Sequence, residues 1–285
     1  MSIKTTVITG PTSGIGKVTA QELAKKDHAL YLLVRNTEKG EELRKELIAQ
    51  TGNQAIFVIK CDLADLQSVR KAADELKAKL FNINVLINNA GGAFRERALS
   101  KDGFELTFSI NHLGHFLLTE SLMPLLQKGQ ARIINVASEA HRSAKPNFDD
   151  LQMEQSYNGL KAYGINKLFN IYFSKSLAEK YRQTGITAYA LHPGVVNTEI
   201  WDKATGFLRI MVWLMKPFMI SPQKGAETTV YLATQPKLEK SSGLYFKKCK
   251  VAKTAPNADN VAARNRLWEI SEKLIKGFLT PEISK

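Results

Sequence analysis

The sequence predicts an α/β fold built on a single doubly wound parallel sheet with helices on both faces. Short, nearly uncharged runs rich in valine and isoleucine alternate with amphipathic stretches through the first two thirds of the chain. Such runs are typical of parallel strands covered on both faces, and strict strand–helix alternation implies right-handed crossovers. Because no repeat, low-complexity tract or flexible linker interrupts the pattern, we expect one domain over residues 1–285.

The expected elements follow one another along the chain. Strands are expected at residues 5–9, 29–34, 55–60, 85–88, 132–136 and 187–191. Helices are expected at residues 15–26, 41–50, 67–80, 104–126 and 162–180. Asn111 falls inside the apolar stretch 104–126. Since a buried amide needs hydrogen-bond partners, we expect Asn111 to distort that helix.

The pattern changes near Asp202. Residues 207–220 form an unusually apolar, methionine-rich segment that is broken at Pro217. One interpretation is a buried core helix. The other, favoured by its position after the sixth strand, is a lid over approximately 202–220 that lines a substrate pocket. A basic helical region is expected at approximately 250–285.

Composition narrows the class of protein. Hydrophobic content of 44% and charged content of 24% are ordinary for a globular protein. Cys61 and Cys249 lie far apart without metal or redox spacing, so we expect free thiols in a reducing, cytoplasmic compartment and no metal site. The start of the sequence lacks a signal-peptide pattern, and no run of about 20 apolar residues predicts a spanning helix.

The formal net charge of +13 permits contact with nucleic acid or with an anionic membrane. Lysines are spread along the whole chain and are often mixed with acids, as in residues 38–46. We therefore expect a solvated basic surface and no nucleic-acid partner. The densest cluster, from Lys247 to Lys253, fits either a peripheral contact with anionic lipid headgroups or a solvated edge.

A glycine-rich turn separates the first strand from the first helix. Glycine lets the backbone turn sharply and approach a pyrophosphate, whose charge is favoured at a helix N-terminus. The spacing Gly-x-x-x-Gly-x-Gly alone is a weak signal, which the flanking strand and helix strengthen. The turn predicts a dinucleotide site formed by Gly10, Thr12, Ser13, Gly14, Ile15 and Gly16.

The end of the second strand indicates which dinucleotide binds. An NAD site normally offers a carboxylate there, but this sequence has Arg35 and Asn36, and no acid before Glu38. A guanidinium can bind a 2′-phosphate, which a carboxylate would repel. The alternative is that Arg35 is only a solvent-exposed residue at the end of the strand, with no role in binding. We expect NADP(H).

The third and fourth strands also end in polar residues at the carboxyl edge, where ligands collect. Asp62 could accept the adenine amino group with Leu63 packing nearby. An ordinary turn-forming aspartate is the simpler interpretation, and it would be preferred if the glycine turn were absent. Asn89, Ala90 and Gly91 follow the fourth strand and are expected to contact the cofactor. The preceding Asn88 is expected only to tie adjacent loops together.

Tyr163 and Lys167 stand four residues apart, which places both side chains on one helix face. Free tyrosine titrates near pH 10, and a neighbouring cation favours its phenolate. Tyr-x-x-x-Lys alone is a weak signal, because short motifs often match by chance. Combined with a dinucleotide turn, the pair predicts proton transfer and redox chemistry.

Together these residues resemble the short-chain dehydrogenase/reductase family, a Rossmann-fold family. The resemblance covers most of the chain. Within the family the sequence is similar to the retinol dehydrogenase-like branch, through residues 34–36, 111–116, 216–222 and 266–268. The matching motifs, in order, are Thr9-Gly10-x-x-x-Gly14-Ile15-Gly16, Asn88-Asn89-Ala90-Gly91, Asn111, Ser138, Tyr163-x-x-x-Lys167 and Pro193-Gly194.

The resemblance implies roles for these positions. Tyr163 would be the catalytic acid/base, Lys167 would lower its pKa and hold the nicotinamide ribose, and Ser138 would hydrogen-bond the substrate oxygen. Asn111 would anchor a water that links Lys167 to solvent. Cofactor contacts would also come from Pro193, Gly194, Val196 and Thr198, the last of these to the nicotinamide carboxamide.

The resemblance also bears on partners. Several members of the retinol-active branch carry an N-terminal membrane anchor, whereas this sequence begins at its first expected strand. We therefore expect a small hydrophobic aldehyde, ketone or alcohol as substrate, without naming a retinoid. The helices at 104–126 and 162–180 often form subunit contacts in the family, which permits a homo-oligomer.

Two functional classes remain open from the sequence. The first is an NADP(H)-dependent carbonyl reductase or alcohol dehydrogenase, and the second is a dinucleotide-binding sensor or scaffold with little chemistry. The presence of all four expected catalytic residues favours the first. His112 and His115 have a spacing that could hold a metal, but packing or surface roles are expected because no third ligand is evident.

Overall fold

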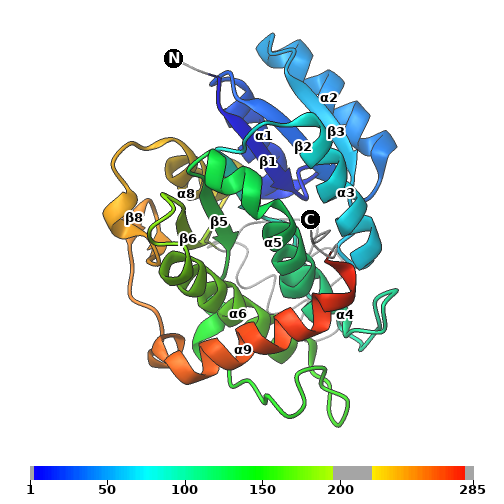
Figure 1. The fold of residues 1–285 in the computed structure, drawn as a ribbon, viewed down its shortest axis with the longest axis vertical. Coiled ribbons are helices and arrows are strands. Elements are labelled where there is room, and N and C mark those ends of the chain that lie inside the picture. Colours follow the sequence, from blue (N-terminus) through cyan, green and yellow to red (C-terminus); the bar gives the residue numbers. More distant parts are fainter. Residues whose placement is uncertain (1–2, 195–219, 280–285) are drawn as a thin grey trace, which may run out of the picture.

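The structure, a computed structural model, describes residues 3–194 and 220–279. Within them one sheet has the strand order β3-β2-β1-β4-β5-β6-β7-β8 (Figure 1). All neighbours are parallel except β7 and β8. The strands are β1 (Thr5–Thr9), β2 (Ala29–Val34), β3 (Ile56–Lys60), β4 (Val85–Asn88), β5 (Arg132–Val136), β6 (Thr187–His192), β7 (Tyr245–Lys247) and β8 (Lys250–Val251).

The predicted doubly wound α/β fold is confirmed, and each of the six predicted strands exists with its bounds correct to within one residue. The sequence did not reveal β7 and β8, because they are only three and two residues long and carry lysines. The basic cluster expected from Lys247 onward lies on this edge pair. Lys247 itself pairs with Glu139 at 3.4 Å.

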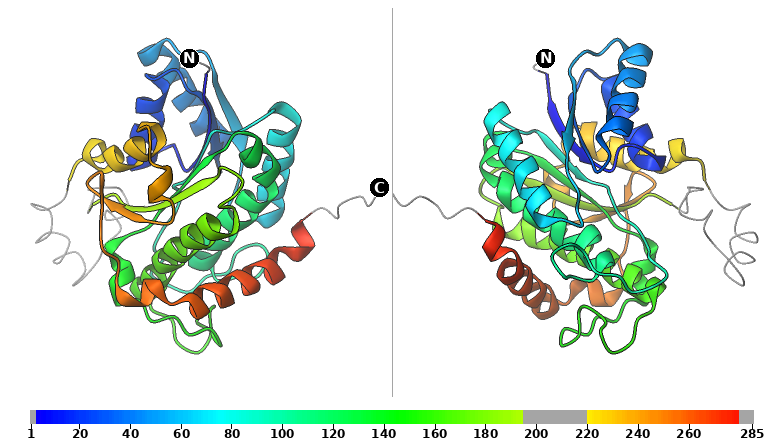
Figure 2. Two further views of the ribbon diagram at one scale, coloured as in Figure 1. Left: turned by 60° about the vertical axis from the view of Figure 1, so that its left-hand side comes forward. Right: turned by 90° about the vertical axis from the view of Figure 1, so that its right-hand side faces the viewer.

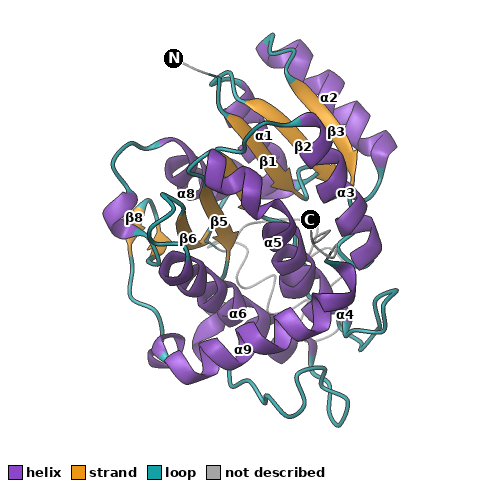
Figure 3. Cartoon of the chain, viewed as in Figure 1, coloured by secondary structure: helices purple, strands orange, loops and turns teal. Residues whose placement is uncertain are grey.

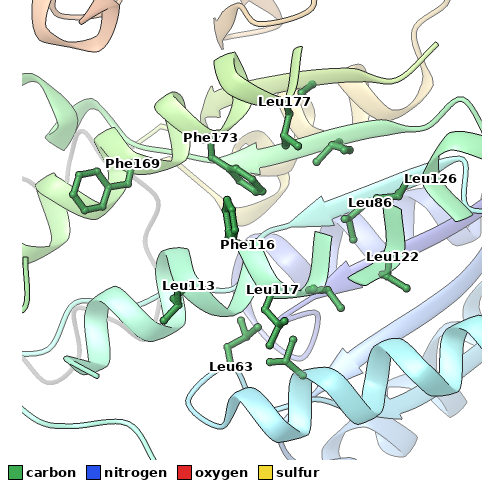
Figure 4. Packing of buried hydrophobic residues seen from close by; sticks show 14 of the residues in the cluster. Leu63, Leu86, Leu113, Phe116, Leu117, Leu122, Leu126, Phe169, Phe173 and Leu177 are labelled. Atoms are coloured by element: carbon green, nitrogen blue, oxygen red, sulfur yellow. The ribbon is translucent and has the colours of Figure 1, made fainter. Parts of the chain in front are cut away.

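Helices cover both faces of the sheet (Figure 2). Along each strand, successive side chains point to opposite faces, so Val7 and Ile8 belong to two different apolar clusters. One face carries α1 (Gly14–Ala24), α2 (Thr37–Thr51) and α8 (Pro222–Thr234). The other carries α3 (Leu66–Lys79), α5 (Gly114–Lys128) and α6 (Gly159–Lys180). Figure 4 labels buried leucines and phenylalanines of α5 and α6.

Helix α9 (Val261–Ile275) forms a further layer outside α5 and α6 (Figures 1 and 3). Trp268 packs edge-on against Phe116 with the ring centroids 4.9 Å apart. The His112 Nε2 atom lies 2.8 Å from the Ser271 Oγ atom, so His112 has the packing role that was expected. Part of the surface of α5 and α6 is thus covered by the chain's own C-terminal helix.

The remaining short elements connect these layers. The described part of the predicted region 250–285 is helical only in part, since it begins with β8. Within residues 3–194 and 220–279, no helix is both long and apolar enough to cross a membrane. The connecting elements are α4 (Leu106–Phe108), η1 (Ser109–Leu113), η2 (Glu139–Ser143), η5 (Glu239–Ser241), η6 (Pro256–Asp259) and η7 (Lys276–Phe278).

Candidate active site

The glycine-rich turn joins β1 to α1 in a conformation that needs glycine. Gly10 and Gly14 have φ angles of +62° and +53°, in the left-handed region. A Cβ atom on Gly10 would lie 2.9 Å from Ala90, and one on Gly16 would lie 2.2 Å from the Gly10 carbonyl oxygen. The turn is therefore packed closely against the end of β4, and larger side chains at Gly10 or Gly16 would not fit.

The N-terminus of α1 fits a phosphate group. Its N-cap residue, Ser13, makes no capping hydrogen bond with its side chain. The first N–H groups of a helix have no partner within the helix, and with the helix dipole they attract anions. In contrast, side chains cap the helices α2, α3, α6, α8 and α9. The donors of α1 are thus left for a ligand, as a bound dinucleotide would require.

The end of β2 presents a cation rather than a carboxylate. Arg35 is exposed, and the adjacent Asn36 accepts a hydrogen bond from the Lys39 backbone N–H at 3.0 Å, which caps α2. Gly10 N donates to Leu33 O at 3.2 Å, so this strand end lies beside the glycine turn. The geometry leaves the Arg35 guanidinium available to an anionic group.

Asp62 and Leu63, the residues predicted to contact the adenine, also make contacts within the protein. The Asp62 carboxylate accepts from Ala64 N at 3.0 Å, which is the turn-forming role weighed as the simpler interpretation. The Leu63 side chain is buried in the apolar core, and its carbonyl oxygen accepts from the Ser109 hydroxyl at 3.1 Å. A cofactor role for either residue remains a prediction.

Thr9 holds the end of β4 against the glycine turn. Its hydroxyl accepts hydrogen bonds from Asn89 N and Ala90 N, each at 3.0 Å. The Asn89 side chain donates in turn to Thr9 O at 2.9 Å and Gly10 O at 3.1 Å. Asn88 donates to the Asn135 side chain of β5 at 2.8 Å, so it ties adjacent elements together as expected. Thr9 belongs to the matched motif, but its contacts with Asn89 and Ala90 become evident only in the fold.

Asn111 and Lys167 meet beside Gly91. A Cβ atom built on Gly91 would lie 2.4 Å from Asn111 Oδ1 and 3.2 Å from Lys167 Nζ. Lys167 donates to Val136 O at 2.9 Å and stands 5.4 Å from the centroid of the Tyr163 ring. The Ser138 side chain in turn interacts with that of Tyr163. The structure therefore brings all four predicted catalytic side chains together at the carboxyl ends of β4 and β5.

Asn111 occupies the distorted part of its helix. Residues Ser109–Leu113 form a π-helical segment, η1, between α4 and α5. The Asn111 side chain donates to Gly92 O at 2.8 Å and Thr107 O at 2.9 Å, and accepts from Gly92 N at 3.2 Å. The expected distortion of the helix is confirmed, because this segment is π-helical and not α-helical. Such π segments are uncommon and often occur at functional sites.

Burial shifts the pKa values of Tyr163 and Lys167. It raises the pKa of the Tyr163 phenol, and an interaction with the Ser138 side chain opposes that shift. The expected lowering of this pKa by Lys167 is therefore not seen, because the effect of burial outweighs it. Burial also lowers the pKa of the Lys167 ammonium to about 8. Without a ligand, Tyr163 is therefore protonated at neutral pH and Lys167 is largely charged. A protonated phenol is the form that can donate a proton to a carbonyl oxygen.

Ser138 lies at the end of β5 and caps η2 by accepting from Ala140 N at 3.2 Å. The next residue, Glu139, accepts from Tyr245 Oη at 2.8 Å and from Arg142 Nε at 2.9 Å. Burial alone would raise the pKa of Glu139, but these hydrogen bonds and the Lys247 charge hold it at about 2. No local pattern in the sequence predicts this contact, because Tyr245 lies more than 100 residues away from Glu139.

The remaining predicted contacts follow β6. Gly194 has a φ angle of +104°, and a Cβ atom there would lie 2.4 Å from Ile220 Cδ1. Pro193 precedes it and is partly buried. Val196, Thr198 and the expected lid, apart from Ile220, lie outside the described residues.

A surface hollow of about 600 Å³ lies elsewhere, between the loop after η2 and α9. Arg142, Phe148, Tyr172 and Arg266 are among the residues that line it, and no predicted site residue does. It is therefore separate from the candidate active site.

Comparisons with known proteins agree with this geometry. Residues 4–207 match the model of the family described as short chain dehydrogenase. Human retinol dehydrogenase 11 is 42% identical over 273 residues, which cover 95% of this chain and 86% of that protein. Mouse retinol dehydrogenase 12 is 41% identical over 274 residues, with the same coverage of both chains.

Solved structures agree as well. A crystal structure of an uncharacterized protein from Mycobacterium paratuberculosis superposes with a TM-score of 0.76 at 31% identity, covering 96% of this chain and 93% of that one. The chain therefore belongs to the short-chain dehydrogenase family, an oxidoreductase family whose members bind a nicotinamide dinucleotide.

Proposed function

We propose that this chain is an NADP(H)-dependent oxidoreductase that interconverts a carbonyl and an alcohol on a hydrophobic substrate. The observation that carries the proposal is the meeting of Asn111, Tyr163 and Lys167 beside Gly91, at the same sheet edge as the glycine turn. A protein that only binds a dinucleotide has no need of a buried lysine beside a tyrosine, because burying a charge is costly.

The side chains divide the chemistry between them. The bound dinucleotide supplies or accepts the hydride. Tyr163 donates its phenolic proton to the substrate oxygen during reduction, and Ser138 donates a hydrogen bond to the same oxygen. Lys167 keeps a positive charge near the phenol, which favours the phenolate that forms. Asn111 anchors a water through which Tyr163, by way of Lys167, regains its proton from solvent.

The choice of NADP(H) rests on charge at the end of β2. Arg35 is exposed there, Lys39 follows it, and the first acid is Glu38 in the first turn of α2. A 2′-phosphate would be attracted to the guanidinium. The rest of the dinucleotide would contact the residues named for the glycine turn, Asp62, Leu63, Asn89 to Gly91, Pro193, Gly194, Val196 and Thr198.

The substrate class is inferred from relatives and from sequence. Two relatives at about 40% identity are named retinol dehydrogenases, which act on a long apolar alcohol. The apolar, methionine-rich segment expected to form the lid agrees with an apolar substrate. We therefore place the substrate among apolar primary or secondary alcohols and their aldehydes or ketones, and retinol is one candidate.

A turnover assay tests this proposal. Purified protein with NADPH is offered aliphatic aldehydes of increasing chain length, aromatic ketones and retinal, and NADPH oxidation is followed. We expect the rate to rise with apolar chain length. If NADPH binds but no carbonyl in the panel is reduced, the chain is a dinucleotide sensor or scaffold.

A charge reversal tests the cofactor. Arg35→Asp should lower the preference for NADPH over NADH, by about 10- to 1000-fold if a charge-assisted contact worth a few kcal/mol is lost and repulsion is added. Arg182→Asp, the same change at an exposed arginine far along the chain, is the control and should leave the preference unchanged. An unaltered ratio in Arg35→Asp would place the 2′-phosphate elsewhere.

A further inference from the structure

Two buried histidines touch the backbone of two residues proposed to be catalytic. His115, on α5, is 2% exposed, and its Nδ1 atom lies 3.3 Å from the carbonyl oxygen of Asn111. His141, on η2, is 0% exposed, and its Nδ1 atom lies 2.6 Å from the carbonyl oxygen of Ser138. The same ring atom faces the same kind of backbone group in both cases.

The partners of Thr9 decide the tautomer of His115. A hydroxyl has one proton and two acceptor lone pairs. Both lone pairs of the Thr9 hydroxyl are used by the N–H groups of Asn89 and Ala90. Its proton must therefore be donated, and His115 Nε2 at 2.9 Å is a better acceptor than Ile87 O at 3.4 Å. Nε2 accepts, so the ring proton of His115 is on Nδ1 and points at Asn111 O.

The partner of His141 gives the same answer independently. The backbone N–H of Ala255 can only donate, and it lies 3.1 Å from His141 Nε2. That nitrogen accepts, so the proton of this ring is also on Nδ1. It is donated to Ser138 O, which cannot itself donate.

Both rings are neutral at physiological pH. Burial lowers the pKa of His115 to about 3, aided by the charge of Lys167 and opposed by the hydrogen bond to Asn111. Burial also lowers the pKa of His141, opposed by its bond to Ser138 and aided by Arg142. A neutral ring has one N–H, so the two contacts of each histidine fix its tautomer completely.

We propose that His115 and His141 are positioning residues, which orient Asn111 and Ser138 by donating Nδ1–H to their backbone carbonyl groups. Through Thr9, His115 links the cofactor-binding turn to the π segment that carries Asn111. His141 links the loop at Ala255 to the residue that orients the substrate oxygen. The inference rests on the proposed function for its kinetic consequences, but the tautomers can be measured without any turnover.

The tautomers are measured first, on unaltered protein. Long-range ¹H–¹⁵N correlation spectra of the ¹⁵N-labelled full chain separate Nδ1–H from Nε2–H rings. His115 is identified by its contacts with Thr9, and His141 by its contacts with Ala255. We expect both to be neutral Nδ1–H tautomers at pH 7. An Nε2–H or a doubly protonated ring at either position overturns the proposal for that residue.

Paired variants then test positioning. An asparagine side chain can place a donor near Nδ1, whereas glutamine can only replace the contact at Nε2. His115→Gln and His141→Gln should lower kcat by about 10- to 100-fold, as small misplacements of catalytic groups do. His115→Asn and His141→Asn should restore most of kcat. KM for NADPH should change less than kcat in His141→Gln, because His141 does not contact the cofactor turn.

His28 provides the matched control. It is 5% exposed and its Nδ1 atom lies 2.7 Å from the Thr6 hydroxyl, away from the active site. His28→Gln should lower the melting temperature as much as the other glutamine variants do, with little loss of kcat. If His115→Gln and His141→Gln also lower the melting temperature with no greater loss of kcat than His28→Gln shows, the two histidines have only a structural role and the proposal is wrong. If unaltered protein shows no turnover, the proposed function fails, and the spectra alone decide the tautomers.

Discussion

Lowering the pH from 7.5 to 5.5 is expected to destabilise the folded protein through its buried histidines. Burial lowers the pKa of His28 and His192 to about 4, and that of His112 and His115 to about 3. Each of these side chains is less than a tenth exposed. In the unfolded chain a histidine titrates near 6.5, so between these values the unfolded state binds more protons. Stability is therefore present above pH 6.5 and falls as the pH falls.

The magnitude follows from that difference. At pH 5.5 an unfolded histidine with a pKa of 6.5 gains about RT ln 11, or about 1.4 kcal/mol, from protonation. A folded-state pKa of about 4 or less gains almost nothing there, so the penalty for four histidines is about 5 kcal/mol. Glu120 acts in the opposite direction, because burial raises its pKa to about 7. It offsets about 2 kcal/mol, which leaves a net loss of about 3 to 4 kcal/mol.

Chemical denaturation followed by tryptophan fluorescence measures this loss. The midpoint should fall between pH 7.5 and 5.5 while the slope with denaturant stays constant. In His28→Gln the loss should be smaller by about 1.4 kcal/mol, because one buried histidine is gone. Stability that is unchanged or higher at pH 5.5 would refute the view that these rings are neutral in the folded protein.

Two further predictions test the cofactor and catalytic ends of the site with matched pairs. Gly91→Ala should lower kcat/KM by about 100-fold, because the new Cβ atom would displace Asn111 and Lys167. The control Gly277→Ala should leave kcat/KM unchanged, because nothing lies within 4 Å of a Cβ atom there. Equal activity of the two variants would contradict the geometry. Ser13→Ala should leave the free energy of unfolding unchanged but weaken NADPH binding, since Ser13 caps nothing within the chain. Asn36→Ala should lower the free energy of unfolding by about 1 kcal/mol, because the N-cap of α2 is lost. If calorimetry finds the same loss of stability in Ser13→Ala and Asn36→Ala, the inference that Ser13 caps nothing is wrong.

The sequence predicted the strands well because parallel strands that are buried on both faces are continuous apolar runs. It missed β7 (Tyr245–Lys247), since a three-residue edge strand beside lysines has no such run. It also predicted that Asn111 would distort its helix, because a buried amide must find partners wherever it lies.

The contacts that support the proposed catalytic residues could not be predicted in the same way. The contacts of Thr9 with His115, and of Glu139 with Tyr245, join residues that are 106 positions apart in both cases. Such pairs are brought together only by the strand order, and no local pattern in the sequence encodes them. The predicted catalytic residues were identified by motif, whereas the contacts of His115 with Asn111 and of His141 with Ser138 were visible only in the folded chain.

The most direct measurement of the central claim is the turnover of Tyr163→Phe. The variant should keep the free energy of unfolding and the NADPH affinity of the unaltered protein, because only the phenolic oxygen is removed. Its kcat should fall by about 100- to 10,000-fold, the usual contribution of a positioned acid or base. A kcat within a few-fold of the unaltered protein would show that another group supplies the proton.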